Sequence, residues 1–295
     1  MAEPRYIGRF APSPSGDLHF GSIVTALAGY LEARSRDGLW YLRLDDLDPP
    51  RNVPGSADAI CRTLERLGLI WDGDIMFQSG RSDAHAAAFA QLEAQGLVYP
   101  CHCSRRALAG RPHPSRCPAP SGKSGDRPAW RLRVGSTTVT LHDRIQGPLH
   151  WTLAATSGDF VVWRVESIAA YHLAAVVDDA ALGITDVVRG ADLLEAAPAQ
   201  RHLQTLLDLP SPTYAHLPVA VSVHGQKLSK QNHAPDVAGH STAATLAAAL
   251  AWLGQPSELA CAGAPARDIL AEACTRWSLA AIPAISRQPA PREFG

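Results

Sequence analysis

The stretch that decides the fold reads Pro12-Ser13-Pro14-Ser15-Gly16-Asp17-Leu18-His19-Phe20-Gly21-Ser22. It follows a short apolar segment at residues 6–10, which predicts a strand, and it leads into a helical pattern over residues 21–34 with Ile23, Leu27 and Leu31 on one face. A loop rich in Pro, Ser and Gly between a strand and a helix is where parallel α/β sheets bind ligands, beyond the carboxyl ends of the strands. The stretch therefore predicts both a sheet and the place of its ligand site.

The rest of the first hundred residues continues this alternation. Residues 40–44 predict a second strand, and residues 56–67 and 82–95 predict helices that Ser56 and Ser82 would cap. Strand, helix, strand and helix in this order are typical of a parallel sheet covered by helices. We therefore expect the fold class to be α/β.

The alternation breaks at Cys101, and five prolines within residues 112–128 make the next stretch irregular. Strand-like segments then follow at residues 130–134, 137–142 and 160–164. This pattern predicts an inserted α+β subdomain. The α/β pattern resumes with segments at residues 173–177 and 184–188 and a helix at residues 193–207.

The last part of the chain is short. After Lys230 the pattern predicts Ala-rich helices at residues 242–253 and 265–274, and we expect the last dozen residues to be frayed. Only 65 residues follow Lys230, too few for another large domain.

The composition is that of an ordinary globular protein of about two domains. The chain has 295 residues, of which 46% are hydrophobic and 19% charged, and no apolar run approaches the ~20 residues of a membrane helix. Residues 1–5 show no signal pattern, so we expect a cytoplasmic location without membrane contact. We also expect a monomer. The net charge of −1 gives no general signature of nucleic-acid binding. A local cluster of basic residues near the middle of the chain belongs either to a solvated loop or to an RNA contact. The cluster consists of Arg105, Arg106, Arg111, Arg116, Lys123 and Arg127.

Two polar segments are suited to phosphate. Gly16 and Gly21 lack side chains that would keep a ligand from the backbone, His19 can donate to phosphate oxygens, and the following helix offers free N–H groups. Far downstream, Lys227 and Lys230 lie three residues apart and can close on a polyphosphate. Taken alone, the first segment is equally consistent with a plain turn and a helix-capping His, and the second segment is better explained by a solvated loop.

Three of the six cysteines crowd within seventeen positions. Cys101 and Cys103, then His113 after nine intervening residues and Cys117 after three more, supply three sulfur donors and one nitrogen donor. Zinc binds such sets tetrahedrally, and in a cytosolic protein this crowding favours a metal over disulfides. His102 is a substitute ligand, and the alternative is a set of reduced surface cysteines without metal.

Several motifs together resemble one enzyme family. The segment Arg9-Phe10-Ala11-Pro12-Ser13-Pro14 with His19-Phe20-Gly21 resembles the HIGH signature of class I aminoacyl-tRNA synthetases, and Lys227-Leu228-Ser229-Lys230 resembles their KMSKS loop. Arg43-Leu44-Asp45-Asp46-Leu47-Asp48-Pro49 and residues 171–190 resemble the glutamyl branch. The resemblance covers residues 5 to about 232. The chain departs from the pattern at Ser22, where the signature has His, and at Asp45, where the family usually has Glu.

The resemblance implies a Rossmann-like catalytic domain that activates an amino acid with ATP. The residues that would bind ATP are Pro12, Gly16, His19, Gly21, Lys227 and Lys230. Of these, His19, Lys227 and Lys230 would be catalytic, because they stabilise charge at the α-phosphate and on the departing pyrophosphate. Mg²⁺ would accompany ATP, held mostly by substrate and water.

The resemblance also implies a glutamate pocket. Arg9 and Arg189 match positions that hold the side-chain carboxylate, which a guanidinium pairs bidentately. The positions that bind the ammonium and backbone end of glutamate are matched by Ser13, Asp45 and Tyr171. Without the family pattern, the favoured explanations are a surface ion pair with Asp192 for Arg189 and core packing for Tyr171.

The family comparison extends to metal and domains. Short synthetase paralogues carry a Cys-x-Cys…Tyr-x₃-Cys zinc motif, in which His113 falls at the Tyr position. The resemblance implies one structural zinc per chain and divides the chain into four segments. Residues 1–100 and 161–210 would be the two halves of the catalytic domain, and residues 101–160 an inserted zinc-binding, acceptor-like subdomain. Residues 211–295 would hold the Lys227–Lys230 loop and a short helical region, with no anticodon-binding domain.

Members of the family with this short architecture activate glutamate without tRNA and ester-link it to queuosine at the wobble position of tRNA(Asp). Ala191, where glutamyl enzymes that charge tRNA more often have Glu, fits this subgroup. Two alternatives stay open. One is a truncated glutamyl enzyme that charges a tRNA 3′ end, and the other is a non-catalytic paralogue that binds glutamate or adenylate.

Overall fold

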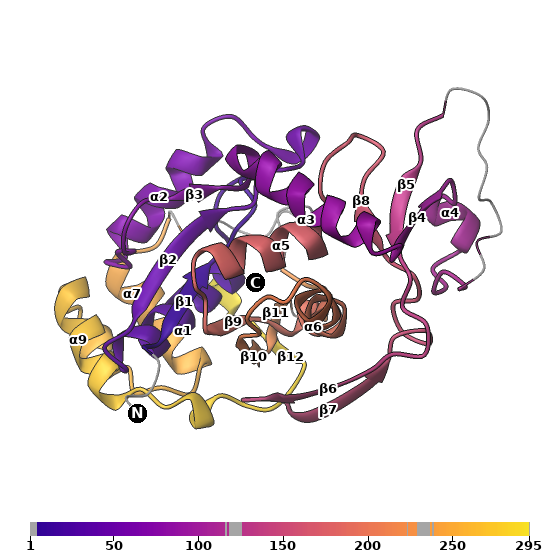
Figure 1. Ribbon diagram of the computed structural model, residues 1–295. Coiled ribbons are helices and arrows are strands. Elements are labelled where there is room, and N and C mark those ends of the chain that lie inside the picture. Colours follow the sequence, from indigo (N-terminus) through magenta and orange to yellow (C-terminus); the bar gives the residue numbers. More distant parts are fainter. Residues whose placement is uncertain are drawn as a thin grey trace.

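Parallel strands form the centre of the computed structural model, which describes residues 5–115, 117, 126–222, 224–228, 237 and 239–294. Strands β1 (Ile7–Phe10), β2 (Leu39–Leu44) and β3 (Met76–Phe77) pair in that order, and β9 (Asp186–Gly190) pairs with β10 (Thr213–Leu217), all in parallel. The backbone N–H of Thr185 donates to the carbonyl of Ile7 at 2.9 Å, which places β9 beside β1. β1 therefore lies in the middle, with β2 and β3 on one side and β9 and β10 on the other (Figure 1).

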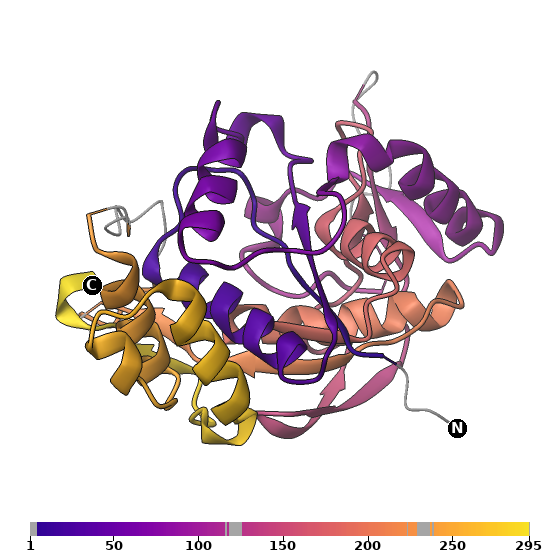
Figure 2. The same ribbon diagram turned by 90° about the vertical axis from the view of Figure 1, so that its left-hand side faces the viewer.

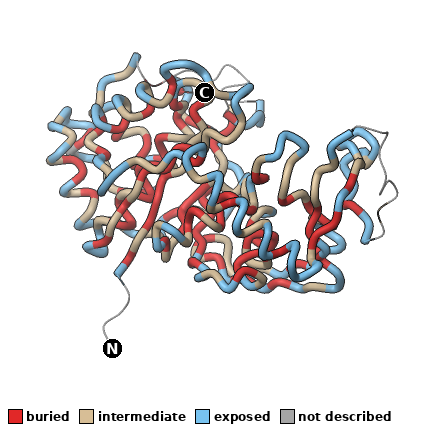
Figure 3. The backbone as a smooth tube through the Cα atoms, turned by 45° about the horizontal axis from the view of Figure 1, so that its top comes forward, coloured by how far each residue is buried: buried red, intermediate tan, exposed pale blue. Residues whose placement is uncertain are grey.

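Alternation along the strands gives the sheet two apolar faces, because successive side chains of a strand point to opposite sides. Val188 and Ala215 pack in the large core around helix α1 (Phe20–Arg34), whereas their neighbours Val187 and Tyr214 pack in a separate cluster on the other side. Helix α1 is apolar on most of its surface because it lies between the sheet and the C-terminal helices. Figure 3 shows the buried residues running through these central elements.

Helices cover both faces of the sheet. The α1 side also carries α2 (Ser56–Arg66), α7 (Thr242–Trp252), α8 (Glu258–Cys261) and α9 (Ala266–Arg276), and Figure 2 shows the C-terminal helices beside α1. The opposite side carries α3 (Ser82–Ala94), α5 (Tyr171–Ala181) and α6 (Ala197–Leu206). Within the described residues, no helix combines the length and the apolar character needed to span a bilayer.

The inserted part is mainly antiparallel. Strands β4 (Val98–Cys101), β5 (Ala129–Leu132) and β8 (Val161–Trp163) form one sheet, with the short helix α4 (Arg105–Leu108) after β4. A hairpin of β6 (Thr138–Asp143) and β7 (Gly147–Thr152) leaves this sheet and returns to β10, where the N–H of Arg144 donates to the carbonyl of Tyr214 at 2.8 Å (Figure 1). The hairpin thus joins the insertion to the central parallel sheet.

The end of the chain is ordered as far as residue 294, so the expectation of frayed residues is wrong there. Strand β12 (Arg287–Pro289) pairs in parallel with β11 (Val219–Val221), near the short 3₁₀ turns η5 (Leu279–Ala281) and η6 (Arg292–Phe294). The Phe294 ring is only 1% exposed and stacks on Phe20 at 4.8 Å between centroids. An aromatic ring that fills the core holds this segment in place.

Local details differ from the sequence expectations where a distant contact competes. Helix α2 begins after Gly55, whose φ of 77° requires glycine, and the Ser56 hydroxyl bonds the N–H and the carbonyl of Gly16 instead of capping. Helix α3 is preceded by Arg81 of the 3₁₀ turn η2 (Gln78–Arg81), so the Ser82 cap is also wrong. Residues 173–177 lie in α5, residues 184–188 overlap β9, and the helix expected at 193–207 begins as the 3₁₀ turn η3 (Ala191–Ala196).

Candidate active site

One cleft of about 790 Å³ lies at the carboxyl ends of β1, β2 and β9, where the strand order reverses around β1. It gathers residues that are distant in sequence because most of them lie near the end of one of these strands or just after it, at the start of α1 or α5, or in the loop after β11. The predicted site residues that line it are Arg9, Pro12, Ser13, His19, Gly21, Asp45, Tyr171, Arg189 and Lys227. Gly16 does not line the cleft, because its backbone groups are bonded to Ser56. Lys230 lies outside the described residues.

The N-terminus of α1 forms the first end of the cleft. His19 is the N-cap of this helix, and its Nδ1 accepts the N–H of Ser22 at 3.3 Å, as the capping alternative predicts. A Cβ on Gly21 would lie 3.2 Å from the His19 ring, so a larger residue would crowd this ring. The helix dipole and the backbone N–H groups at this end favour a bound anion.

Lys227 faces the same cleft from the loop after β11. This loop is fixed by the buried Leu228, whose N–H donates to the carbonyl of Ala220 at 2.9 Å. The ammonium group of Lys227 pairs with Asp192, and their side chains are 49% and 33% exposed. An exposed pair of this kind contributes about 0–1 kcal/mol, so an incoming phosphate can take over the lysine at small cost.

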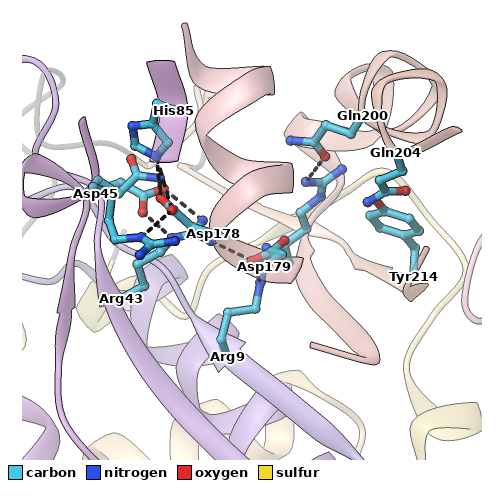
Figure 4. Close-up of polar contacts among 12 residues, drawn as sticks. Arg9, Arg43, Asp45, His85, Asp178, Asp179, Gln200, Gln204 and Tyr214 are labelled. Atoms are coloured by element: carbon cyan, nitrogen blue, oxygen red, sulfur yellow. Dashed lines mark hydrogen bonds and ion pairs between the residues drawn. The ribbon is translucent and has the colours of Figure 1, made fainter. Parts of the chain in front are cut away.

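A buried ion network forms the second end of the cleft (Figure 4). Asp179 of α5 accepts hydrogen bonds at one oxygen, Oδ1, from Arg9 Nε at 3.0 Å and from Arg43 Nη1 at 2.6 Å. Arg43 also donates to both oxygens of Asp45, at 2.7 and 3.3 Å. Burial acts to raise the pKa of Asp179, but the guanidinium groups of Arg9 and Arg43 outweigh it and hold this pKa below its usual value. Burial raises the pKa of Asp45, although Arg43 acts against the shift.

Arg189 is buried at this end of the cleft without a carboxylate partner among the described residues. It is 4% exposed, and its guanidinium donates to His216 Nε2 at 2.9 Å, to Gln200 Oε1 at 2.7 Å and to the carbonyl of Leu193 at 3.2 Å. The alternative of a surface ion pair with Asp192 is therefore wrong. Tyr171, at the start of α5, is 39% exposed and lines the cleft, so core packing is also wrong for this ring.

Several residues around the cleft were missed by sequence reasoning. The carboxylate of Asp178 accepts hydrogen bonds from His85, Gln78 and Arg81, at distances of 3.0 to 3.1 Å. Beside Tyr171, His172 has a pKa lowered to about 4, mainly by burial and further by the charge of Arg189. A usable signal was present, because two consecutive acidic residues in an apolar helical run need buried partners.

The sulfur and nitrogen donors of the insertion come together. The ligand atoms of Cys101, Cys103, His113 and Cys117 all lie within 4.8 Å of one another. Four ligands at about 2.0–2.3 Å from one ion lie about 3.5–3.8 Å apart, and the sulfur of Cys117 is 3.5 Å from that of Cys101 and 3.8 Å from that of Cys103. This cluster can hold a metal ion.

The surroundings of the cluster fit a metal as well. His113 Nδ1 lies 2.8 Å from the carbonyl of Pro114, to which it donates, so its Nε2 lone pair faces the sulfurs. Burial acts to raise the pKa of Cys101, but the N–H of Cys103 and the guanidinium of Arg131 outweigh it and lower this pKa. A lower thiol pKa favours the thiolate, which is the form that binds metals.

The two ends of the cleft define what it can bind. The first end offers a helix N-terminus, His19 and Lys227, and the second offers the guanidinium of Arg189 next to an ion-paired frame. The cleft therefore complements two ligands together, one with phosphate groups and one with a carboxylate. Binding both ligands side by side converts a bimolecular reaction into a step within one complex.

Comparisons with known proteins agree with this chemistry. Residues 7–121 and 118–243 match the family described as tRNA synthetases class I (E and Q), catalytic domain. The chain is 48% identical to a glutamyl-Q tRNA(Asp) synthetase of Thiobacillus denitrificans over 97% of this chain and 98% of that protein. It is 48% identical to a protein of the same name from Aromatoleum aromaticum over 99% of this chain and 95% of that protein. The crystal structure of a glutamate-tRNA synthetase from Elizabethkingia anophelis has the same fold, with a TM-score of 0.81 and 22% identity over 98% of this chain and 69% of that one.

Proposed function

The chain belongs to the class I tRNA synthetases of the glutamate and glutamine branch, and from this premise we propose that it activates L-glutamate with ATP and transfers it to queuosine at the wobble position of tRNA(Asp). The observation that carries the proposal is a single cleft that the N-terminus of α1, Lys227 and Arg189 line together. The names of these relatives supply the acceptor, queuosine in tRNA(Asp).

In the proposed complex, glutamate lies at the second end of the cleft. Its side-chain carboxylate pairs with Arg189 and lies near Arg9, whose own charge is already balanced by Asp179. Its ammonium and backbone end lie near Ser13, Asp45 and Tyr171. Glutamine would leave the buried guanidinium of Arg189 without a charged partner, which is a large penalty inside a protein.

ATP lies at the first end, with its phosphates against the N-terminus of α1. The α-carboxylate of glutamate attacks the α-phosphorus, the bond to the bridging oxygen breaks, and pyrophosphate leaves. His19 and Lys227 stabilise the negative charge that develops there, and Lys230 is proposed to act with them from the loop beyond the described residues. Mg²⁺ bound with ATP neutralises phosphate charge, and its ligands are mainly phosphate and water. Pro12 and Gly21 shape the same end, and Gly16 supports it from behind the loop.

Transfer then uses the adenylate. A hydroxyl of the cyclopentene ring of queuosine attacks the activated carbonyl, the ester forms, AMP leaves, and the hydroxyl proton is released. We further propose that the cysteine cluster holds one structural zinc, which stiffens the Pro-rich loop after β4. We also propose that the chain acts as a monomer.

The test has two parts. The first is glutamate-dependent exchange of pyrophosphate into ATP in the absence of tRNA, with glutamine in place of glutamate as the control. The second is mass spectrometry of nucleosides from tRNA(Asp) after incubation with ATP and labelled glutamate, with queuosine-free tRNA(Asp) as the control. We expect exchange with glutamate alone and label on queuosine. Label on the terminal adenosine would indicate an enzyme that charges tRNA, and a lack of exchange would indicate a non-catalytic binding protein.

A further inference from the structure

A chain of three buried side chains reaches from the β6–β7 hairpin to the cleft. Asp143 at the end of β6 lies 2.6 Å from Nδ1 of His216 in β10, and both side chains are 0% exposed. Nε2 of the same imidazole accepts the Nε–H of Arg189 at 2.9 Å. Neither Asp143 nor His216 lines the cleft, so neither side chain is placed to contact a substrate there.

The hydrogen bonds determine which nitrogen of His216 carries the proton. Arginine only donates, so Nε2 must present its lone pair to Arg189, and Nδ1 must carry the hydrogen that Asp143 accepts. Asp143 accepts at its other oxygen, Oδ1, from three backbone N–H groups, those of residues 145, 146 and 216, at 3.0, 2.9 and 3.1 Å. These N–H groups and His216 lower the pKa of Asp143 although burial acts to raise it, and burial lowers the pKa of His216. The imidazole is therefore a neutral acceptor beside an ionised carboxylate.

Neutral acceptors leave the charge of Arg189 available. Its hydrogen-bond acceptors in the described part of the chain are an imidazole, the Gln200 amide and the carbonyl of Leu193, and its Cζ lies 5.1 Å from the centroid of the Tyr214 ring; none of these groups is charged. The acceptors take three of the five N–H groups of the guanidinium. The remaining two, one on each terminal nitrogen, are free to donate to a carboxylate in the cleft.

We propose that Asp143 and His216 are positioning residues, which hold the Arg189 guanidinium in place through a neutral imidazole and so set the preference of the pocket for an amino acid with a side-chain carboxylate. This role rests on the proposed function, because it assigns the glutamate side chain to Arg189. A carboxylate in direct contact with Arg189 would hold the guanidinium equally well but would cancel the charge that distinguishes glutamate from glutamine. The intervening His216 keeps Asp143 one ring away.

The sharpest variant is Asp143→Asn, which keeps the shape of the side chain. The amide oxygen can still accept the three backbone N–H groups, but the NH₂ group then faces His216 Nδ1 and donates to it. The imidazole proton would move to Nε2, where it opposes the Nε–H of Arg189. We expect the KM for glutamate in pyrophosphate exchange to rise about tenfold to a hundredfold, the range for a lost hydrogen bond to a charged group, and the KM for ATP to stay within about twofold.

A conservative variant and a control complete the design. His216→Gln retains an oxygen acceptor for Arg189 and an amide N–H for Asp143, so we expect its KM for glutamate within about threefold of the parent value, whereas His216→Leu should resemble Asp143→Asn. Glu32→Gln changes another buried carboxylate, which accepts from Arg144 and Trp277 away from the cleft, and should lower thermal stability with no change in the KM for glutamate.

The outcomes separate the two levels of the argument. Wild-type protein without glutamate-dependent exchange would refute the proposed function and this role with it. Normal wild-type exchange together with equal changes in both KM values, or with no change, in Asp143→Asn would refute the positioning role alone. If Asp143→Asn does not fold, the same comparison between His216→Leu and His216→Gln decides, and equal KM values for glutamate in these two variants would overturn the proposal.

Discussion

Asp179→Asn is the most informative single change for the frame of the cleft. In the parent protein, Asp179 Oδ1 receives hydrogen bonds from Arg9 and Arg43, and the three side chains are only 9%, 5% and 1% exposed. Asparagine has nearly the same shape but no charge. The variant would leave two buried guanidinium groups with Asp45 as the nearest remaining carboxylate, and Asp45 is bonded to Arg43.

The expected magnitude follows from this burial. Removing one partner of a buried ion pair costs about 3–5 kcal/mol, because the other charge stays buried without compensation. A loss of 1 kcal/mol lowers Tm by about 2–4 °C in domains of 150–250 residues, so we expect a decrease of about 6–20 °C at pH 7.5. Thermal unfolding followed by circular dichroism measures it. The exposed pair Arg267–Asp268 supplies the control, because Asp268→Asn should change Tm by less than about 2 °C.

The pH dependence gives an independent check. The pKa of Asp179 is lowered in the folded protein, so its contribution to stability is complete above the unfolded value of about 3.9 and is lost as the pH falls through the lower folded value. The difference in Tm between parent and Asp179→Asn should therefore be constant from pH 7.5 to about pH 5 and should narrow below about pH 4. A variant that melts within about 2 °C of the parent at pH 7.5, or a difference that widens in acid, would refute the reasoning.

Other changes test the rest of the cleft and the metal cluster. Arg189→Leu should raise the KM for glutamate about thirtyfold or more and leave the KM for ATP nearly unchanged, because truncating one member of a buried charge pair costs about 2–5 kcal/mol. Steady-state pyrophosphate exchange measures both KM values. Equal increases in the two KM values would place Arg189 outside the glutamate pocket. Lys230→Ala should abolish adenylate formation while calorimetry still detects glutamate binding, and unchanged exchange would contradict its role. Elemental analysis should find about one zinc per chain. Cys103→Ser, or removal of zinc by a chelator, should lower Tm and make the insertion sensitive to protease. Purified protein that contains no zinc would rule out the proposed zinc site.

The sequence predicted those parts of the fold whose cause is local. Strand β1, helix α1 and the cleft loop between them follow from a period of apolar residues and from Pro and Gly at the turn, and all three lie where we expected. The predicted N-caps at Ser56 and Ser82 are wrong because N-cap preferences reflect only residues that are adjacent in the sequence. The Ser56 hydroxyl bonds Gly16, forty positions away in the chain, and this contact exists only in the folded protein.

The candidate site shows the same division. Motifs marked Arg9, Asp45 and Arg189, and the structure brings all three to one cleft. Motifs gave no sign of Asp143, because its effect on Arg189 passes through His216 on a different strand. Such residues depend on which elements pack together, here a hairpin of the insertion against β10, and apolar periodicity does not specify that contact.

The isolation of the Arg189 charge also bears on how the specificity of such enzymes diverges in evolution. Arg9 and Arg43 are already balanced by Asp179 and Asp45, so this part of the pocket is electrically neutral before any substrate arrives. In the proposed pocket, preference for an acidic amino acid then depends on one cation whose direct hydrogen-bond partners are all uncharged. A lineage could change the substrate by altering that one position, while the ion-paired scaffold that folds the cleft is inherited intact.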